Sequence, residues 1–221
     1  MFPFEFPLMK TIWREICYRP RWYADSYTEL ERLFKWSEDP WNFQSSSYER
    51  ERLQVLLRVV QRYPHDSVLE VGCGEGVFTR ELTKISKQVV GIDISPTALG
   101  RAKRRCPTTT FLNVRVEDFE WHSKFDMVIC AETLYYIKNV DAAIEKLRGL
   151  GRFSIVSYIH RESRTLDPYV MQMPLIEFTR FQKSYWFWKR MMTVALWENN
   201  GSTSNHQDSL LEGSFPALAE K

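Results

Sequence analysis

Short apolar runs alternate with helix-like stretches through the middle of the chain. The apolar runs have the length of β-strands and fall at residues 67–71, 88–93, 110–116, 125–130 and 152–158. The stretches with helical character fall at 77–85, after Ser95-Pro96 and at 139–147. The run at 125–130 is apolar throughout, as a strand covered on both faces should be. This alternation predicts an α/β fold in which helices cover both faces of a mostly parallel sheet.

The pattern changes after the fifth apolar run. A polar crossover that contains Pro168 and Pro174 follows it. Two further runs, at 178–188 and 191–198, stand too close together for a helix between them, so they predict a β-hairpin. Five strands and this hairpin make a sheet of seven strands.

The two ends of the chain differ from the middle. Residues 1–46 are rich in aromatic side chains and predict a helical extension, which either packs on the domain or forms a lid over a ligand. Ser46 and Glu49 have the spacing of a capping box, so a helix should begin there and end near Pro64. Residues 199–221 are polar and predict a flexible tail. One α/β domain therefore occupies residues 47–198.

The most specific signal lies where the first strand ends. Gly72, Gly74 and Gly76 stand at alternate positions, and Asp93 ends the second strand. Glycines let a ligand approach the backbone closely, and the helix that follows offers free N–H groups to an anionic group. An acid at the end of the second strand can accept hydrogen bonds from both hydroxyls of a ribose. Together these features predict a nucleoside-like cofactor.

The glycine spacing separates two classes of cofactor. The dinucleotide fingerprint requires a glycine at position 77, which is Val77 here. The pattern that begins at Glu70 instead resembles motif I of the class I S-adenosylmethionine-dependent methyltransferases. That resemblance implies S-adenosyl-L-methionine as the cofactor. It also implies a Rossmann-like sheet of seven strands, one of them antiparallel, with a C-terminal β-hairpin.

The same resemblance implies which residues bind the cofactor. In this family the glycine loop holds the methionine moiety and the second-strand acid holds the ribose. An acid after the third strand, here Asp118, binds the adenine amino group. The cofactor-binding residues implied in this way are Glu70, Gly72, Cys73, Gly74, Gly76, Asp93, Ile94, Glu117, Asp118, Phe119 and Ala131.

Candidate residues for the reaction follow the fourth and fifth strands, because open α/β sheets bind ligands at the carboxyl ends of their strands. Glu132 could hold or deprotonate a cationic amine, or cap a helix. Tyr136 could present its hydroxyl to the methyl acceptor, or pack in the core. His160 could accept a proton, although a lone histidine is more often structural.

A series of short motifs narrows the resemblance to one family. The motifs are Asp39-Pro40-Trp41, Ser45–Glu49, Leu69–Cys73, Asp93-Ile94-Ser95 and Glu132–Tyr136. The series is similar to nodulation protein S and its relatives, which are N-methyltransferases that act on the free amine of a de-N-acetylated sugar oligomer. The likeness covers residues 39–160. It implies that Trp41 and Tyr48 close over the cofactor.

Composition excludes several other classes of protein. The 221 residues have a net charge of +2, which by itself indicates neither a nucleic-acid partner nor a membrane surface. The basic cluster at 101–105 is typical of a solvated helix face. Four widely spaced cysteines indicate a reducing compartment, and no group of residues has metal-ligand spacing. Without a signal-peptide pattern or a long apolar run, we expect a cytoplasmic protein that contacts no membrane.

These observations favour one function over several rivals. We expect methyl transfer from S-adenosyl-L-methionine to a small-molecule acceptor, and the resemblance implies the amine of an amino-sugar-like compound. The rivals are a small-molecule O-methyltransferase and a non-catalytic sensor or scaffold that binds the cofactor. Methylation of nucleic acid is disfavoured, because Asp167-Pro168-Tyr169 matches the D-P-P-Y motif only in part and follows a different strand. The oligomeric state stays open.

Overall fold

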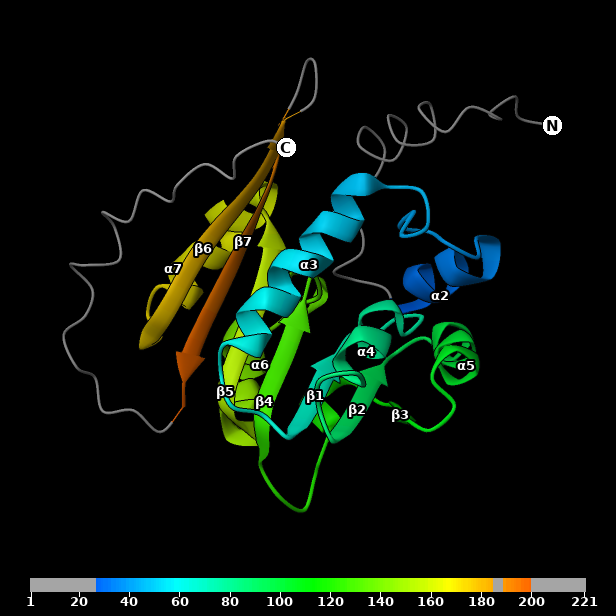
Figure 1. Ribbon diagram of the computed structural model, residues 1–221, viewed down its shortest axis with the longest axis horizontal. Helices are drawn as coiled ribbons and strands as arrows, with labels where there is room; N and C mark the ends of the chain where they lie inside the picture. Colours follow the sequence, from blue (N-terminus) through cyan, green and yellow to red (C-terminus); the bar gives the residue numbers. More distant parts are fainter. Residues whose placement is uncertain (1–26, 185–188, 200–221) are drawn as a thin grey trace.

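The strands form one mixed sheet in the order β3-β2-β1-β4-β5-β7-β6 (Figure 1). The structure is a computed structural model that describes residues 27–184 and 189–199. Its strands are β1 (Ser67–Val71), β2 (Gln88–Asp93), β3 (Thr110–Asn113), β4 (Phe125–Ala131), β5 (Gly151–Ile159), β6 (Leu175–Ser184) and β7 (Lys189–Glu198). Its α-helices are α2 (Tyr27–Trp36), α3 (Ser47–Gln61), α4 (Val77–Leu82), α5 (Pro96–Arg105), α6 (Val140–Leu150) and α7 (Ser163–Val170). Its 3-10 helices are η2 (Val116–Asp118), η3 (Leu134–Tyr136) and η4 (His160–Glu162).

The direction of the strands confirms the expected sheet. Strand β7 runs antiparallel to both of its neighbours, β5 and β6, and the other pairs are parallel. The strand order reverses at β1, which pairs with β2 on one side and with β4 on the other. Ligands of open α/β sheets bind at such a reversal, beyond the carboxyl ends of the strands. The topology therefore places the site next to the loops after β1 and β4.

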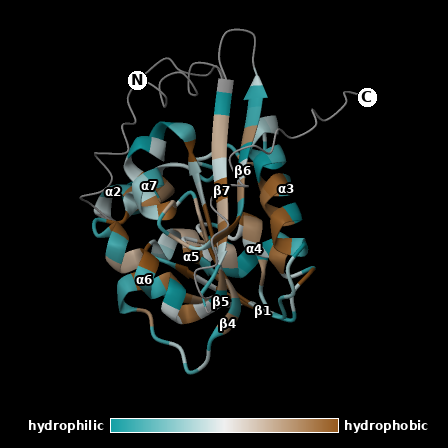
Figure 2. Cartoon of the chain, turned by 90° about the vertical axis from the view of Figure 1, so that its left-hand side faces the viewer, coloured by the Kyte–Doolittle hydropathy of each residue, from teal (hydrophilic) through white to brown (hydrophobic). Residues whose placement is uncertain are grey.

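Helices cover both faces of the sheet and enclose two apolar cores. One core joins α3 and α4 to the sheet and includes Leu56 and Leu82, both fully buried. The other joins α6 and α7 to the opposite face and includes Leu147 and Leu166. Figure 2 shows α6 and α3 on opposite sides of the strands. Strand β1 is buried on both faces for this reason, which explains its continuous apolar run.

Side-chain caps start three of the helices. Ser46, Ser95 and Asn139 each accept a hydrogen bond from the backbone N–H three residues later. The expected capping box of α3 is only half formed. The Glu49 carboxylate accepts a hydrogen bond from Arg52, while the N–H of Ser46 donates to the carbonyl of Asn42. The reason for this difference lies in the site, where Glu49 and Arg52 form a buried ion pair.

One helix occupies part of the segment expected to be a polar crossover. Helix α7 contains Pro168, which removes one backbone hydrogen bond at a cost of about 3 kcal/mol. Burial of Leu166 and Val170 against the sheet offsets that cost. A hydrogen bond of 2.6 Å from the Tyr158 hydroxyl to Asp167 also fixes the helix to β5. Tertiary contacts therefore outweigh the local effect of the proline.

Several boundaries also differ from the expected ones. The third strand ends at Asn113, because the chain then turns into η2. Helix α4 ends at Leu82 rather than near Ile85, and β6 lies earlier than expected, at Leu175–Ser184. Of the expected extension the structure describes α2 and the loop after it, while residues 1–26 and the tail from residue 200 lie outside the described residues.

Candidate cofactor and acceptor site

A cavity of about 470 Å³ opens at the reversal of the strand order. The glycine loop after β1, the ends of β2, β4 and β5, and residues of α2 and α3 line it. The residues expected from the sequence that line it are Trp41, Tyr48, Glu70, Gly72, Cys73, Gly74, Asp93, Ile94, Glu117, Ala131, Glu132, Tyr136 and His160. The structure thus brings together residues from segments that are far apart in the chain.

Three of the expected residues do not line the cavity. Asp118 has a side chain that is 66% exposed and lies 3.8 Å from Arg115 in an ion pair. Its neighbour Glu117 lines the cavity instead. Phe119 is buried in the core, where its ring stacks on Trp121. Gly76 caps the start of α4 in the left-handed region. The turn of η2 decides which of the two acids faces the cavity, and sequence alone does not fix that turn.

The three loop glycines have different reasons to be glycine. All have positive φ, at +73°, +52° and +73° for Gly72, Gly74 and Gly76. Residues with a side chain rarely adopt this backbone region. A Cβ at Gly72 would overlap the side chain of Thr133, and one at Gly76 would lie 3.0 Å from Ala102. A Cβ at Gly74 would meet only Phe34, at 3.8 Å. Gly74 is therefore the point where a ligand can contact the loop backbone.

Asp93 fixes the glycine loop as well as facing the cavity. Its Oδ2 accepts a hydrogen bond of 2.8 Å from the N–H of Gly74, and its Oδ1 accepts one of 2.8 Å from the N–H of Ser95. Burial raises the pKa of Asp93, while these backbone N–H groups favour its charged form. Each carboxylate oxygen has a second lone pair, so Asp93 can still accept hydrogen bonds from ribose hydroxyls.

Glu70 lies buried beneath the loop. It is 3% exposed and accepts a hydrogen bond of 2.5 Å from the hydroxyl of Thr79. The pKa of Glu70 is raised to about 8, mainly by burial. The hydrogen bond from Thr79 opposes this rise, and the nearby charge of Asp93 adds to it. Glu70 is therefore largely protonated near neutral pH.

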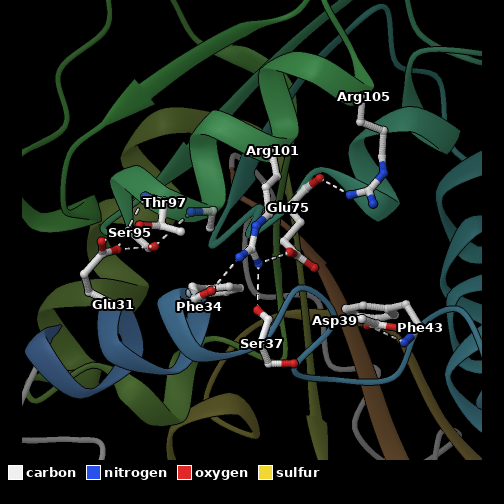
Figure 3. A network of polar contacts seen from close by, with 11 residues as sticks. Glu31, Phe34, Ser37, Asp39, Phe43, Glu75, Ser95, Thr97, Arg101 and Arg105 are labelled. Carbon is white, nitrogen blue, oxygen red and sulfur yellow. Dashed lines mark hydrogen bonds and ion pairs between the residues drawn. The ribbon is translucent and has the colours of Figure 1, made fainter.

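Polar contacts hold α2 against α5 and the glycine loop (Figure 3). Arg101 donates to the carbonyls of Phe34 and Ser37, at 2.6 and 2.8 Å, and to the Glu75 carboxylate at 2.5 Å. Glu31 accepts hydrogen bonds from Ser95 and Thr97 at the start of α5. Arg101 thus joins the end of α2 to the glycine loop. The interpretation of 101–105 as a solvated face is wrong for Arg101, whose side chain is 16% exposed.

A turn after α2 holds Trp41 in the wall of the cavity. The Asp39 carboxylate accepts hydrogen bonds from the N–H groups of Phe43 and Gln44, at 2.8 and 3.0 Å. This turn presents Trp41, whose ring packs edge-on against Phe34 with 6.5 Å between centroids. Both aromatic rings line the cavity, so the extension contributes directly to the site.

Glu132 lines the cavity directly after β4. Its backbone has a φ of +54°, and its N–H donates to the carbonyl of Ser157 at 2.8 Å. Its carboxylate accepts hydrogen bonds from the hydroxyls of Tyr135 and Ser157, at 3.1 and 3.3 Å. Burial raises the pKa of Glu132, and the guanidinium of Arg52, whose Nη1 lies 3.9 Å away, opposes that rise. His160 also lines the cavity but is exposed.

A cluster of buried charged residues on and beside α3 was not predicted from the sequence. The Nε of Arg52 donates to Glu49 at 2.8 Å, and Nη1 of Arg190 lies 3.8 Å from the same carboxylate. The Arg190 guanidinium also lies over the ring of Tyr48, 5.2 Å from its centroid. A signal was present, since Arg52 stands one helical turn before the buried Leu56 and so falls on the apolar face of α3.

Two buried polar atoms of this cluster have no hydrogen-bond partner among the residues that the structure describes. They are the hydroxyl of Tyr48 and Nη1 of Arg52. Buried polar groups in native proteins are nearly always satisfied, by protein, water or ligand. Both residues line the cavity, so a polar ligand can satisfy these atoms.

The described residues contain no group of His, Cys, Asp and Glu side chains that could hold a metal ion. Among the helices described, none is long and apolar enough to cross a membrane.

Comparison with known proteins identifies the family. The model of the family "Nodulation protein S (NodS)" matches residues 25–162. The chain belongs to the nodulation protein S family. It is 36% identical over 110 residues to nodulation protein S of Sinorhizobium fredii. These residues make up 48% of this chain and 51% of that relative. The chain spans about half the length of the curated nodulation protein S relatives that it matches.

Two further comparisons concern the fold and O-methylation, the alternative activity. The fold matches a crystal structure of N-methyltransferase NodS from Bradyrhizobium japonicum in complex with S-adenosyl-L-homocysteine. The TM-score is 0.66 at 24% identity, and the match covers 77% of this chain and 97% of that chain. A ubiquinone biosynthesis O-methyltransferase of Rhodopseudomonas palustris is 30% identical over 87 residues, which cover 38% of this chain and 34% of that relative. The protein therefore has the class I methyltransferase fold.

The protonation of Glu70 leads to a prediction about stability and pH. The pKa of Glu70 in the folded state is about 8, above its ordinary value of 4.5, so the folded protein holds a proton that the unfolded chain releases. This contribution to the free energy of unfolding is complete below the unfolded-state pKa and is lost as pH rises through the folded-state pKa. Glu70→Gln cannot ionise and keeps an oxygen that can accept from Thr79.

We therefore expect Glu70→Gln to gain stability relative to the parent protein as pH rises. The difference between the two should grow by about 3 kcal/mol from roughly pH 5 to roughly pH 9. Denaturant unfolding at several pH values measures it. Glu145→Gln, at a side chain that is 65% exposed, serves as the control and should show a flat difference. A flat difference for Glu70→Gln as well would contradict the assigned protonation.

Proposed function

We propose that the protein is an S-adenosyl-L-methionine-dependent methyltransferase that methylates the amine of a small molecule. The observation that carries the proposal is the cavity itself, which is lined by an open Gly74, by the Asp93 carboxylate and by the Glu132 carboxylate that two hydroxyls hold. Membership of the nodulation protein S family supports the amine as acceptor, and an amino-sugar-like compound is the finer form of the proposal.

The residues of the cavity fit the parts of this cofactor. Asp93 would accept hydrogen bonds from the ribose hydroxyls, and Glu117, which lines the cavity after β3, would accept one from the adenine amino group. The amino-acid part of the cofactor carries an ammonium and a carboxylate. The open loop backbone at Gly74 would contact this part of the cofactor. When bound, the cofactor supplies an activated methyl group on a sulfonium.

The chain's own part in the reaction is to position the cofactor and the acceptor, and to move one proton. Aromatic walls at Phe34, Trp41 and Tyr136 exclude water from the reacting atoms. An amine reacts through its lone pair, so a base must take its proton. Glu132 is better placed than His160 for this role, because two hydroxyls orient its carboxylate while His160 is exposed.

Helix α2 and the loop to residue 46 act in this proposal as a lid. Leu30, Phe34 and Trp41 line the cavity from this segment, and Arg101 fastens its end to the glycine loop. Release of the lid would open the cavity and let the product cofactor leave.

The lid predicts a change in the rate at which the demethylated cofactor dissociates. Arg101→Gln removes the guanidinium that bonds Phe34, Ser37 and Glu75, so S-adenosyl-L-homocysteine should dissociate about tenfold faster. Stopped-flow displacement measures this rate. Arg104→Gln, at an exposed residue of the same helix, should leave it unchanged. Equal rates in both variants would contradict the lid.

The open position at Gly74 predicts loss of cofactor binding on substitution. In Gly74→Val the new side chain would enter the cavity, and a β-branched residue also disfavours a φ of +52°. Calorimetry should detect saturable binding of S-adenosyl-L-methionine to the parent protein and none to this variant. Gly149→Val, at an exposed helix position with open space, is the matched control. Retained affinity in Gly74→Val would place the cofactor elsewhere.

A paired-acceptor assay tests the reaction. Methyl-labelled cofactor is offered with an amine and with the hydroxyl compound of the same skeleton, and label is expected on nitrogen only. Glu132→Gln should lower turnover by about a hundredfold, with cofactor affinity nearly unchanged, because Glu132 acts on the acceptor. Label on oxygen alone would favour the O-methyltransferase alternative, which the ubiquinone-biosynthesis relative supports. No label despite tight binding would favour a sensor or scaffold.

A further inference from the structure

Glu132 has an unusual backbone that a purely structural loop would not require. Its φ of +54° lies in the left-handed region, which residues other than glycine rarely adopt. The hydrogen bond from its N–H to the carbonyl of Ser157 keeps it there. Such strained positions cluster where a side chain must point in one functional direction. Here the direction is the cavity, which Glu132 lines directly after β4.

Two hydroxyl groups from different elements hold the carboxylate. The Tyr135 hydroxyl, on η3, donates to Oε2 at 3.1 Å, and the Ser157 hydroxyl, on β5, donates to Oε1 at 3.3 Å. Ser157 is fully buried in the sheet, and the Tyr135 ring packs on Tyr136 with 4.6 Å between centroids. Each oxygen thus has one rigid donor and one lone pair left for a ligand.

Charged and titratable groups face Glu132 from every element packed against it. Helix α3 contributes Arg52, with Nη1 at 3.9 Å, together with Glu49 and Tyr48. Strand β4 contributes the buried thiol of Cys130. Arg190, at the start of β7, acts through its ion pair with Glu49. His160, at the end of β5, lines the same cavity, as do Tyr135 and Tyr136 of η3.

The balance of these groups favours a carboxylate that titrates above its ordinary range. Burial raises the pKa of Glu132 and the charge of Glu49 adds to the rise, whereas Arg52 and the two hydroxyl donors oppose it. A base of this kind holds a proton more strongly than an ordinary carboxylate does, which suits it to take a proton during the reaction. Loss of either hydroxyl donor would disfavour the charged form and raise the pKa further.

We propose that Tyr135 and Ser157 are positioning residues that aim the Glu132 carboxylate at the acceptor nitrogen, an inference that rests on the proposed N-methylation. As the nitrogen lone pair forms the bond to the methyl carbon, the carbon–sulfur bond breaks and its electron pair stays on sulfur. The positive charge passes from sulfur to nitrogen. One N–H proton then moves to Glu132, which leaves a neutral methylated amine. The two hydroxyls keep the accepting oxygen in line with that proton.

A direct titration of Glu132 tests the positioning without turnover. Carbon-13 NMR of protein labelled at the glutamate carboxyl carbons follows each side chain, and Glu132→Gln identifies the signal. Tyr135→Phe keeps the ring and removes only the donor, so the midpoint of Glu132 should rise by about one pH unit. Tyr63→Phe removes a similar bond, 3.2 Å to Glu177, outside the cavity and should leave the Glu132 midpoint unchanged.

The second donor provides an independent variant. Ser157→Ala should raise the Glu132 midpoint in the same direction as Tyr135→Phe. Ser154→Ala is the matched control, because Ser154 is also fully buried on β5 but accepts its hydrogen bond from Asn199. A Glu132 midpoint that moves in neither Tyr135→Phe nor Ser157→Ala would overturn the proposal.

The pH dependence of methyl transfer gives the functional readout. In Tyr135→Phe the acidic limb of the profile of kcat against pH should move to higher pH by the same amount as the titration midpoint of Glu132. Cofactor affinity should be retained. A loss of kcat that is equal at every pH, with an unmoved limb, would overturn the positioning role. Failure of the parent protein to methylate any amine would instead overturn the proposed function and its proton-acceptor step, while the titration still decides whether the two hydroxyls orient Glu132.

Discussion

The hydrogen bonds of Asp93 are the constraint on which the rest of the site depends. The carboxylate accepts from Gly74 in the loop after β1 and from Ser95 at the start of α5. The Asp93 carbonyl accepts from Asn113, the last residue of β3, and from Val114, which follows it. One residue therefore ties three strand ends together at the reversal of the strand order. The positive φ of Gly74 keeps the loop backbone open beside this anchor. A ligand that reaches the loop must also meet Asp93.

Buried charge imposes the second constraint, where α3 lines the cavity. Glu49 and Glu132 face Arg52 and Arg190 there, so two carboxylates balance two guanidinium groups. Charges removed from water destabilise a fold unless they are paired, so α3 is restricted to a position in which Arg52 reaches both carboxylates. Electrostatics thus fixes the part of α3 that lines the cavity, and hydrophobic packing of Leu56 and its neighbours fixes the rest of α3. The same arrangement leaves Tyr48 and Arg52 with polar atoms for a ligand.

The sequence predicted the features that depend on local pattern. Strand β1 and the glycine loop follow from an apolar run and from backbone needs that only glycine meets, and both were placed correctly. The features it missed depend on distant contacts. Helix α7 forms around Pro168 because the sheet buries its other face, and Arg101 turns inward because α2 offers it carbonyl groups. Both Glu117 and Asp118 were expected at the site, and only Glu117 lines the cavity, because the local turn of η2, which has no pattern in the sequence, decides which acid faces it.

A crystal structure of the complex with S-adenosyl-L-homocysteine tests the account most directly. We expect the ligand to lie in the cavity, with its ribose hydroxyls on Asp93 and its amino-acid part against Gly74. We also expect its sulfur to face Glu132, with room for a small acceptor between them. A ligand bound elsewhere, or one whose sulfur points away from Glu132, would contradict the account.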